Sequence, residues 1–164
     1  AGTPGEIVVR GPQVMNGYWN RPEETATAMR GGFFHTGDAG VMDEDGYLTI
    51  AGRTKEMIIS GGENVYPIET ENALCKHPAV AQAAVIGVPH PKWGEMVYAV
   101  VALHTGKSAT IEDLTAFCRD RIAHYKAPRG MSIWDGALPL SATNKIDKNA
   151  IKALVLQSNK EGTA

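Results

Sequence analysis

Two apolar segments in the middle of the chain constrain its fold more than any other feature of the sequence. They cover Val80–Val88 and Met96–Leu103, and the first contains the uninterrupted run Ala83–Ile86. Such a run, without polar alternation, is typical of a strand that is covered on both faces. Each segment is also far shorter than the ~20 residues that a membrane span requires. We therefore predict strands over Val80–Val88 and Val97–His104, in a sheet that helices cover.

Three helices are predicted around this sheet, and each carries its own start signal. A proline fits the first turn of the first helix, a Thr-x-x-Asp capping box opens the second, and an aspartate starts the third. Residues beyond Gln157 have nothing to bury and are expected to fray. The helices run from Pro67 to about Lys76, from Thr110 to a point before Pro128, and from about Asp147 onward, and a short strand is predicted near Met131–Trp134.

The N-terminal part of the chain has a different character. Alternating residues predict a strand over Glu6–Arg10, and a second strand, Tyr47–Ala51, follows an acidic turn. A short helix that Pro22 opens lies between them. The predicted fold class is therefore α+β. It comprises a compact C-terminal domain, residues 53–164, with a small sheet covered by helices, and a preceding β-rich strip, residues 1–52.

The composition restricts the classes of function. Of the 164 residues, 43% are hydrophobic and 21% are charged, as in an ordinary globular protein and unlike a disordered or fibrous one. The 16 basic and 18 acidic residues give a net charge of -2. The chain thus lacks the positive surface with which nucleic-acid binders release counterions, and nucleic acid is not an expected partner. It begins with Ala1 and has no secretion signal, so we expect a piece of a longer protein.

The two cysteines, Cys75 and Cys118, have no Cys-x-x-Cys or Cys/His spacing. We interpret both as small buried residues in a reducing compartment, and we expect a cytoplasmic location. The spacing indicates neither a disulfide nor a metal site.

Three polar clusters are the candidates for chemistry. One contains Thr36-Gly37-Asp38, the second joins Gly52-Arg53-Thr54-Lys55 to the loop Gly61-Gly62-Glu63-Asn64, and the third is Ser141-Ala142-Thr143-Asn144-Lys145. Each has an ordinary interpretation, because Thr-Gly-Asp is a common turn, a glycine pair is a common loop, and a loop lysine is usually solvated. Function can therefore be inferred only from the three clusters together.

In their order and spacing, these clusters resemble the adenylate-forming acyl-CoA synthetase family. The resemblance spans nearly the whole chain, and several long motifs in the right order are far more specific than one short motif. Other segments of the same pattern are Gly5-Glu6-Ile7-Val8-Val9-Arg10-Gly11, Val85-Ile86-Gly87-Val88-Pro89-His90-Pro91-Lys92-Trp93-Gly94-Glu95, Tyr125-Lys126-Ala127-Pro128 and Pro139-Leu140.

The resemblance implies a two-step reaction. Members of this family join a carboxylic acid to ATP, forming an acyl-adenylate and pyrophosphate, and then pass the acyl group to coenzyme A. A large N-terminal domain holds most of the site, and a small C-terminal domain rotates between the half-reactions. The family's phosphate loop and the Thr-Glu motif that binds adenylate and magnesium do not occur in this sequence. The resemblance therefore implies that residues 1–52 end the large domain, that 53–164 are the mobile domain, that Mg²⁺ binds to the missing N-terminal domain, and that the chain alone is inactive.

The resemblance assigns three residues to adenylation and one to the hinge. Asp38 falls on the ribose-binding carboxylate, and an acceptor-only group can receive both sugar hydroxyls at once. Arg53 matches an arginine that also contacts the ribose, and Lys55 falls on the hinge, where a long polar side chain stays solvated in both orientations. Lys145 matches the catalytic lysine that bridges the carboxylate substrate and the α-phosphate. Asn144 stands where the family usually has glycine, and asparagine tolerates the left-handed conformation.

A second group of residues is assigned to thioester formation. Gly61-Gly62 match the glycine loop that lines the pantetheine tunnel, where absent side chains let a thin molecule pass close to the backbone. Asn64 is assigned a polar contact with the adenylate. Lys126 and Arg129 are candidate partners for the phosphates of coenzyme A, with solvated surface residues as an equal alternative. Trp93 is interpreted first as a packing anchor and second as a wall of the tunnel.

The predicted function is thus the C-terminal portion of a carboxylic acid–CoA ligase for a fatty or aryl acid, with the acid, ATP and coenzyme A as partners. The acyl pocket of this family lies in the N-terminal domain, so the sequence does not identify the acid. The alternative is an isolated module that binds coenzyme A, a nucleotide or a protein partner without catalysis. The strands of residues 1–52 would expose unpaired edges, so we expect this strip to be mobile or to associate with another copy.

Overall fold

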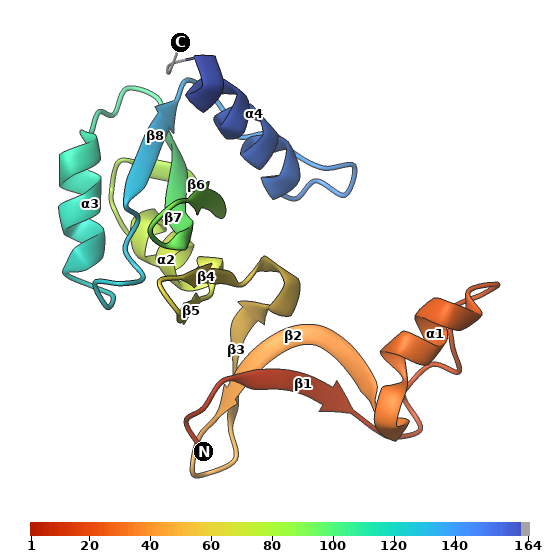
Figure 1. The fold of residues 1–164 in the computed structure, drawn as a ribbon. Helices are drawn as coiled ribbons and strands as arrows, with labels where there is room; N and C mark the ends of the chain where they lie inside the picture. The colour runs from red at the N-terminus through yellow and green to blue at the C-terminus, as the bar shows by residue number, and fades with distance from the viewer. Residues whose placement is uncertain (162–164) are drawn as a thin grey trace. The chain divides into compact units, whose positions relative to one another are not determined.

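The computed structural model describes residues 1–161 and divides into two compact units, residues 1–55 and the residues from Glu56 onward (Figure 1). Helices and mainly antiparallel strands form both, so the predicted α+β class is confirmed. The division falls three residues after the predicted boundary at Gly52, because the last strand of the first unit, β3 (Leu48–Arg53), includes Arg53. Residues 162–164, at the end of the segment predicted to fray, lie outside the described residues.

The first unit is a three-stranded antiparallel sheet in the order β1-β2-β3, with a short helix and a 3-10 turn between β1 and β2. Pro22 occupies the first turn of the helix, followed by Glu23 and Glu24, which suit its positive end. Thr36-Gly37-Asp38 lie within strand β2 and not in a turn, which corrects the sequence interpretation. The elements before β3 are β1 (Gly5–Val9), α1 (Pro22–Ala28), the 3-10 turn η1 (Arg30–Gly32) and β2 (Phe34–Met42).

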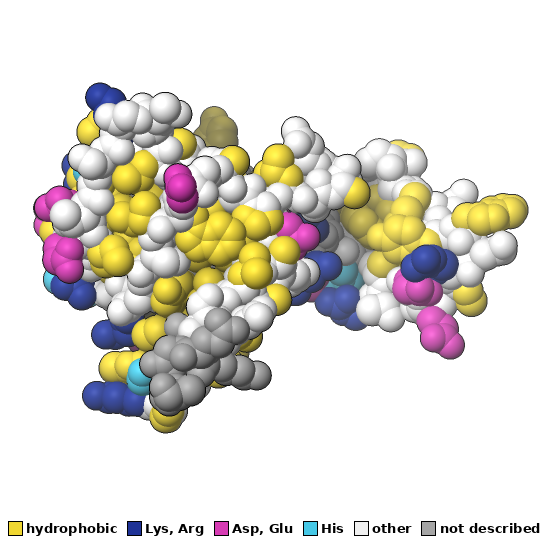
Figure 2. Space-filling model, turned by 90° about the horizontal axis from the view of Figure 1, so that it is seen from above, with side chains coloured by type: hydrophobic (Ala, Val, Ile, Leu, Met, Phe, Trp, Pro, Cys, Tyr) yellow, Lys and Arg dark blue, Asp and Glu magenta, His cyan; other side chains and the backbone are white. Residues whose placement is uncertain are grey.

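This first unit has almost no core of its own. Ala39 is its only buried hydrophobic side chain. Large hydrophobic side chains are exposed instead, and Figure 2 shows such side chains on its surface. The exposed fractions of Trp19, Tyr47 and Ile50 are 90, 73 and 66%. A unit that buries so little apolar surface gains little hydrophobic stabilisation of its own.

The second unit is a five-stranded sheet in which β7 is the central strand. β7 pairs antiparallel with β6 along its length, antiparallel with β4 at Gly94, and in parallel with β8. β5 pairs with β4 at one edge, and β6 forms the other edge. After the 3-10 turn η2 (Thr54–Glu56), the elements are β4 (Ile58–Ser60), β5 (Glu63–Val65), α2 (Pro67–Cys75), β6 (Val80–His90), β7 (Gly94–Leu103), α3 (Ile111–Arg119), β8 (Gly130–Trp134) and α4 (Lys148–Glu161).

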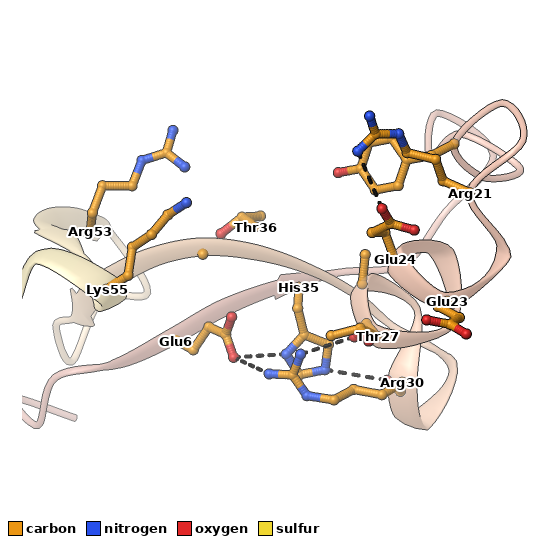
Figure 3. A pocket seen from close by; sticks show the side chains of 13 residues that line it. Glu6, Arg21, Glu23, Glu24, Thr27, Arg30, His35, Thr36, Arg53 and Lys55 are labelled. Atoms are coloured by element: carbon orange, nitrogen blue, oxygen red, sulfur yellow. Dashed lines mark hydrogen bonds and ion pairs between the residues drawn. The ribbon is translucent and has the colours of Figure 1, made fainter.

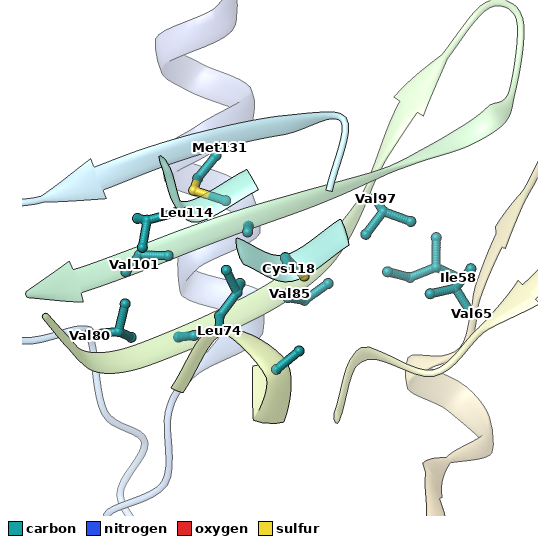
Figure 4. Close-up of a cluster of buried hydrophobic side chains, with 13 residues drawn as sticks. Ile58, Val65, Leu74, Val80, Val85, Val97, Val101, Leu114, Cys118 and Met131 are labelled. Carbon is teal, nitrogen blue, oxygen red and sulfur yellow. The ribbon is translucent and has the colours of Figure 1, made fainter. Parts of the chain in front are cut away.

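Helices cover both faces of this sheet, as predicted. Alternate residues of β6 and β7 point to opposite faces. On one face they form a core with α2 and α3 (Figure 4), and on the other a core with α4. The first core includes Ile58, Val65, Leu74, Val85, Val97, Val101, Leu114, Cys118 and Met131, and the second includes Ile86, Val88, Val100, Leu138, Ile151 and Val155.

The local start signals of the helices are confirmed. Thr110 accepts a hydrogen bond from the Asp113 amide at 3.1 Å, while Asp113 accepts one from the Thr110 amide, which completes the capping box of α3. Pro67 opens α2, and the Asp147 carboxylate accepts bonds from two amides in the first turn of α4. α4 continues past Gln157, where fraying is predicted. No helix within residues 1–161 has both the length and the hydropathy needed to cross a bilayer.

Two sequence interpretations in this unit are wrong. Glu63 and Asn64 belong to strand β5 and not to a loop, because their backbone pairs with β4. Cys75, predicted to be buried, is exposed at the end of α2, while Cys118 is buried as predicted. Both thiols are free.

Candidate functional site

Asp38 and Arg53 face each other across the first sheet. They are register partners on β2 and β3, and Arg53 Nε lies 2.8 Å from Asp38 Oδ1. The Asp38 side chain remains 31% exposed and that of Arg53 50% exposed. An ion pair this open adds little stability, and it keeps carboxylate oxygens and guanidinium donors accessible to a polar ligand. The fold thus brings the two predicted ribose-binding residues together.

Short hydrogen bonds fix the backbone around Asp38. Gly37 has a φ of +73°, in the left-handed region that favours glycine. The Thr36 hydroxyl donates to the Ile7 carbonyl at 2.8 Å and accepts from the Asp38 amide at 3.1 Å. The Thr54 hydroxyl donates to the Gly37 carbonyl at 3.0 Å. The Asp38 segment is therefore tied to β1 on one side and to the end of β3 on the other.

A charged cluster just before this segment has no counterpart in the sequence prediction. Glu6 Oε2 accepts a hydrogen bond from Arg30 at 2.7 Å and lies 2.8 Å from His35 Nδ1 (Figure 3). The hydrogen bond with His35, together with the Arg30 charge, holds the pKa of Glu6 below its usual value. These three residues, with Arg53 and Lys55, help to line an open pocket of the first unit (Figure 3). Because Glu6 and His35 are 29 positions apart, no local pattern signals the cluster.

Gly61 and Gly62 form the two-residue turn between β4 and β5. Their φ values of +62° and +87° are of the kind that two-residue hairpin turns require. The Gly61 amide donates to the Trp93 carbonyl at 2.9 Å, and a Cβ atom on Gly61 would lie 2.8 Å from the Trp93 ring. A Cβ atom on Gly62 would meet nothing within 4 Å. The glycine turn therefore packs against Trp93, with exposed Asn64 on the adjoining strand.

Trp93 is half-buried, and two cations lie over its ring. Arg129 Cζ is 4.2 Å and Lys92 Nζ 4.9 Å from the ring centroid. Lys126, in contrast, is held by an ion pair, with its Nζ 2.6 Å from Glu69 Oε2. Burial by itself would lower the pKa of Lys126, but its contact with Glu69 outweighs burial and raises the pKa. Arg129 thus lies over the Trp93 ring that packs against the glycine turn. The Lys126 ammonium group, in contrast, is already paired with the Glu69 carboxylate.

Lys145 lies on a tight loop between β8 and α4. Leu140 and Ile146 form an antiparallel bridge at the base of the loop, and the Ser141 amide donates to the Lys145 carbonyl at 2.7 Å. Asn144 has a φ of +60°, the left-handed conformation anticipated for a residue in place of glycine. The Lys145 side chain is exposed and forms no ion pair with any residue that the structure describes. A loop closed by backbone hydrogen bonds therefore presents an exposed ammonium group.

The predicted site residues fall into three groups. Asp38, Arg53 and Lys55 belong to the first unit. Within the second unit, the glycine turn lies with Trp93 and Arg129, and Lys145 lies on its own loop. The part of the chain that the structure describes contains no cluster of three or more His, Cys, Asp or Glu side chains that could hold a metal ion.

Comparison with known proteins finds close relatives and similar structures. Residues 69–145 match the AMP-binding enzyme C-terminal domain. The chain is 50% identical over 92% of its length to a 2-succinylbenzoate–CoA ligase of Geobacillus kaustophilus, and 51% identical over 87% to a long-chain-fatty-acid–CoA ligase of Bacillus subtilis. Its fold matches the o-succinylbenzoate CoA synthetase of Bacillus subtilis in complex with its acyl-adenylate intermediate, with a TM-score of 0.86 and 42% identity over 92% of this chain. The chain belongs to the adenylate-forming acyl-CoA synthetase family.

The chain spans only part of each of these acyl-CoA synthetases. It covers 31% of the Geobacillus ligase, 25% of the fatty-acid ligase and 30% of the solved synthetase. The two ligases are named for different acids, yet the chain is almost equally identical to both. Identity over this region therefore does not separate the acids.

Proposed function

We propose that the chain is the C-terminal part of an AMP-forming carboxylic acid–CoA ligase for a fatty or aryl acid. In the first half-reaction a carboxylate oxygen attacks the α-phosphorus of ATP, and the bond to pyrophosphate breaks. In the second, the deprotonated sulfur of coenzyme A attacks the acyl carbon, and AMP leaves as the thioester forms. The observation that carries the proposal is the open Asp38–Arg53 pair, in a chain 42% identical to a synthetase solved with its acyl-adenylate.

We assign the first unit to the end of the large N-terminal domain and the second unit to the mobile C-terminal domain. The lack of a core in the first unit supports this assignment, because its exposed hydrophobic side chains would be buried against the rest of a larger domain. The second unit has two cores of its own. Lys55, exposed and last before the second unit, is the proposed hinge, as the family resemblance implies.

In adenylation, Asp38 accepts the ribose hydroxyls and Arg53 donates to the same sugar. Their accessible pairing supports these roles, because Arg53 can orient the carboxylate while leaving acceptor sites open. Lys145 places its ammonium group between the substrate carboxylate and the α-phosphate, where negative charge gathers as the bond forms. Its exposure, and the absence of an acidic partner among the described residues, support this role.

In thioester formation, Gly61 and Gly62 line the path of the pantetheine arm, and Asn64 makes a polar contact with the adenylate. The open space beside Gly62 supports this role. Arg129 is the stronger candidate for a phosphate of coenzyme A, because a phosphate at Lys126 would compete with Glu69. Trp93 acts as the packing anchor of the glycine turn.

The remaining parts of the proposal concern groups outside the chain and its surroundings. Magnesium binds with ATP to the large domain, as the family resemblance implies. Two free thiols support a reducing, cytoplasmic location. The exposed hydrophobic side chains of the first unit support self-association of the chain when the large domain is absent.

A domain exchange tests the proposed function. This chain replaces the matching C-terminal part of the Geobacillus kaustophilus ligase, and acid-dependent pyrophosphate release and CoA thioester formation are measured. We expect the exchange protein to turn over its acid, and the chain alone to release no pyrophosphate above background with ATP, Mg²⁺, coenzyme A and a panel of acids. Turnover by the repurified chain alone would contradict the proposal. An inactive exchange protein, together with tight binding of coenzyme A by the chain in calorimetry, would favour the non-catalytic binding module.

A further inference from the structure

A single ammonium group joins three elements of the second unit. Lys148 Nζ lies 2.7 Å from Glu56 Oε2 and 2.8 Å from Glu71 Oε1. Glu71 Oε1 also accepts a hydrogen bond from the Val85 amide at 2.8 Å, on the edge strand β6. The Glu71 side chain is only 11% exposed, so this carboxylate is part of the interior and not a mobile surface group.

The ion pair with Lys148 ties the Glu56 side chain to the rest of the second unit. It is the first residue of the second unit and follows Lys55, while the first strand of the unit, β4, begins only at Ile58. Within the described part of the chain, Lys148 is the only partner of the Glu56 side chain. The contact therefore extends the rigid part of the second unit back to the residue beside the hinge.

The same lysine fixes the loop that carries Lys145. Lys148 is the first residue of α4, three positions after Lys145. Between them, the Asp147 amide donates to the Pro139 carbonyl at 2.8 Å, while the Asp147 carboxylate caps the helix. The start of α4 is thus the base of the Lys145 loop, and Lys148 ties that base to α2 and to Glu56.

We propose that Lys148 is a positioning residue that confines the hinge to Lys55 and holds the Lys145 loop in the same rigid body as Glu56. The role of Lys55 as a hinge rests on the proposed function. Domain rotation is productive only if the moving body carries Lys145 and the glycine turn as a unit, and a hinge of one residue limits the orientations that this body samples.

The proposal that Lys148 fixes Glu56 is tested by measuring ¹⁵N relaxation of the Glu56 and Met57 amides in the full 164-residue chain. We expect order parameters near about 0.85 in the wild type, falling below about 0.6 in Glu56→Ala, which leaves the Lys148–Glu71 pair intact. Lys148→Met is expected to lower these order parameters as well, whereas Lys148→Arg should keep them at the wild-type level. Lys152→Ala, which removes a 3.5 Å ion pair one turn further along α4, is the control and should change nothing. Unchanged order in Glu56→Ala would overturn the proposal, even if Lys148→Met fails to fold.

The exchange protein tests the functional part. In Glu56→Ala we expect kcat of both half-reactions to fall alike, about three- to tenfold, with KM for acid and ATP unchanged, because fewer molecules occupy a productive orientation. Lys148→Arg should retain both rates. A loss confined to one half-reaction, or a rise in KM alone, would contradict the hinge role. If the unmutated exchange protein is inactive, the proposed function fails, while the order parameters still decide whether Lys148 fixes Glu56.

Discussion

At the scale of single residues, three lysines of the second unit have different surroundings. Lys126 is half-buried against Glu69, Lys148 is shared by Glu56 and Glu71, and Lys145 is exposed without an acidic partner among the described residues. The charge of a paired ammonium group is compensated by its carboxylate partner, whereas an unpaired one remains available to a phosphate or carboxylate. This difference supports a stabilising role for the paired lysines and the proposed catalytic role of Lys145.

Replacing Lys145 should separate the two half-reactions. In the exchange protein, Lys145→Ala is expected to lower acyl-adenylate formation by about 10²–10³, the usual effect of removing one charge stabiliser. Thioester formation from supplied acyl-adenylate should be spared, because the proposed domain rotation would remove Lys145 from the site. Separate assays of pyrophosphate release and thioester formation check this, with Lys152→Ala as the matched lysine variant. An equal loss in both assays would contradict the proposed alternation of domains.

Lys148 should make stability depend on pH in the alkaline range. Burial by itself would lower the pKa of Lys148, but the charges of Glu71 and Glu56 outweigh burial and raise the pKa. The contribution of Lys148 to the free energy of unfolding is therefore fully present below its pKa in the unfolded chain, about 10.4. It is lost as pH rises through the higher pKa of the folded chain. We expect Lys148→Met to lower the free energy of unfolding by about 2–3 kcal/mol at pH 7.

Urea unfolding of wild type and Lys148→Met between pH 7 and about pH 11.5 checks this dependence. The difference between the two proteins should stay constant to about pH 10 and then shrink, because only the wild type carries the titrating ammonium group. A difference that grows with pH would show that the pKa is lowered in the folded chain.

At the scale of elements, the β4–β5 hairpin shows how two neighbouring glycines meet different demands. Both have positive φ, so any other residue at either position would be strained. Only Gly61 also lies against the Trp93 ring. The hairpin thus offers a matched pair in which backbone strain is shared and the steric contact is not.

Alanine at the two positions should therefore have unequal effects. Gly62→Ala is expected to cost about 1–2 kcal/mol of stability through left-handed strain alone. Gly61→Ala should cost about 1–3 kcal/mol more, because its Cβ atom would displace Trp93. Urea midpoints measure both, and equal midpoints would mean that the Trp93 ring moves away without cost.

Local signals made part of this fold predictable. The starts of α2, α3 and α4 and the covered strands β6 and β7 follow from proline, capping residues and continuous apolar runs, which act over a few positions. Strand β2 could not be predicted in this way, because Gly37 and polar neighbours interrupt its alternation and its pairing with β1 and β3 supplies the order. Strand β5 likewise depends on its pairing with β4.

Only those residues of the candidate site that lie within family motifs could be predicted from the sequence. Asp38 and Arg53 were assigned through the family pattern, and the fold pairs them as register partners. The contact between Lys126 and Glu69 spans 57 positions and that between Lys148 and Glu56 spans 92, so no spacing in the sequence signals either. These ion pairs depend on the packing of helices on the sheet, which local patterns do not encode.

At the scale of the whole molecule, the two units differ in how much they bury. Almost all buried hydrophobic side chains belong to the second unit, and Ala39 stands alone in the first. Since burial of apolar surface is the main favourable term in folding, the second unit should be stable alone and the first should depend on contacts outside it.

Limited proteolysis should reveal this difference. We expect trypsin to cut first at the exposed residues Arg53 and Lys55 or before them, leaving a stable product that starts at Thr54 or Glu56 and retains α4. Size-exclusion chromatography should show association of the uncut chain that rises with concentration and is absent from the product. First cleavage between residues 80 and 125, with a strictly monomeric uncut chain, would place the boundary elsewhere.

The central position of β7 has a consequence for synthesis on the ribosome. β4 and β6 both precede β7 as the chain emerges, but β8 pairs with it in parallel only after α3 has crossed over. Until Trp134 has left the exit tunnel, one side of Tyr98–Ala102 keeps its backbone groups unpaired, in an otherwise apolar strand. A nascent chain stalled before Gly130 would therefore carry an open strand edge, the feature that general chaperones and aggregating neighbours capture.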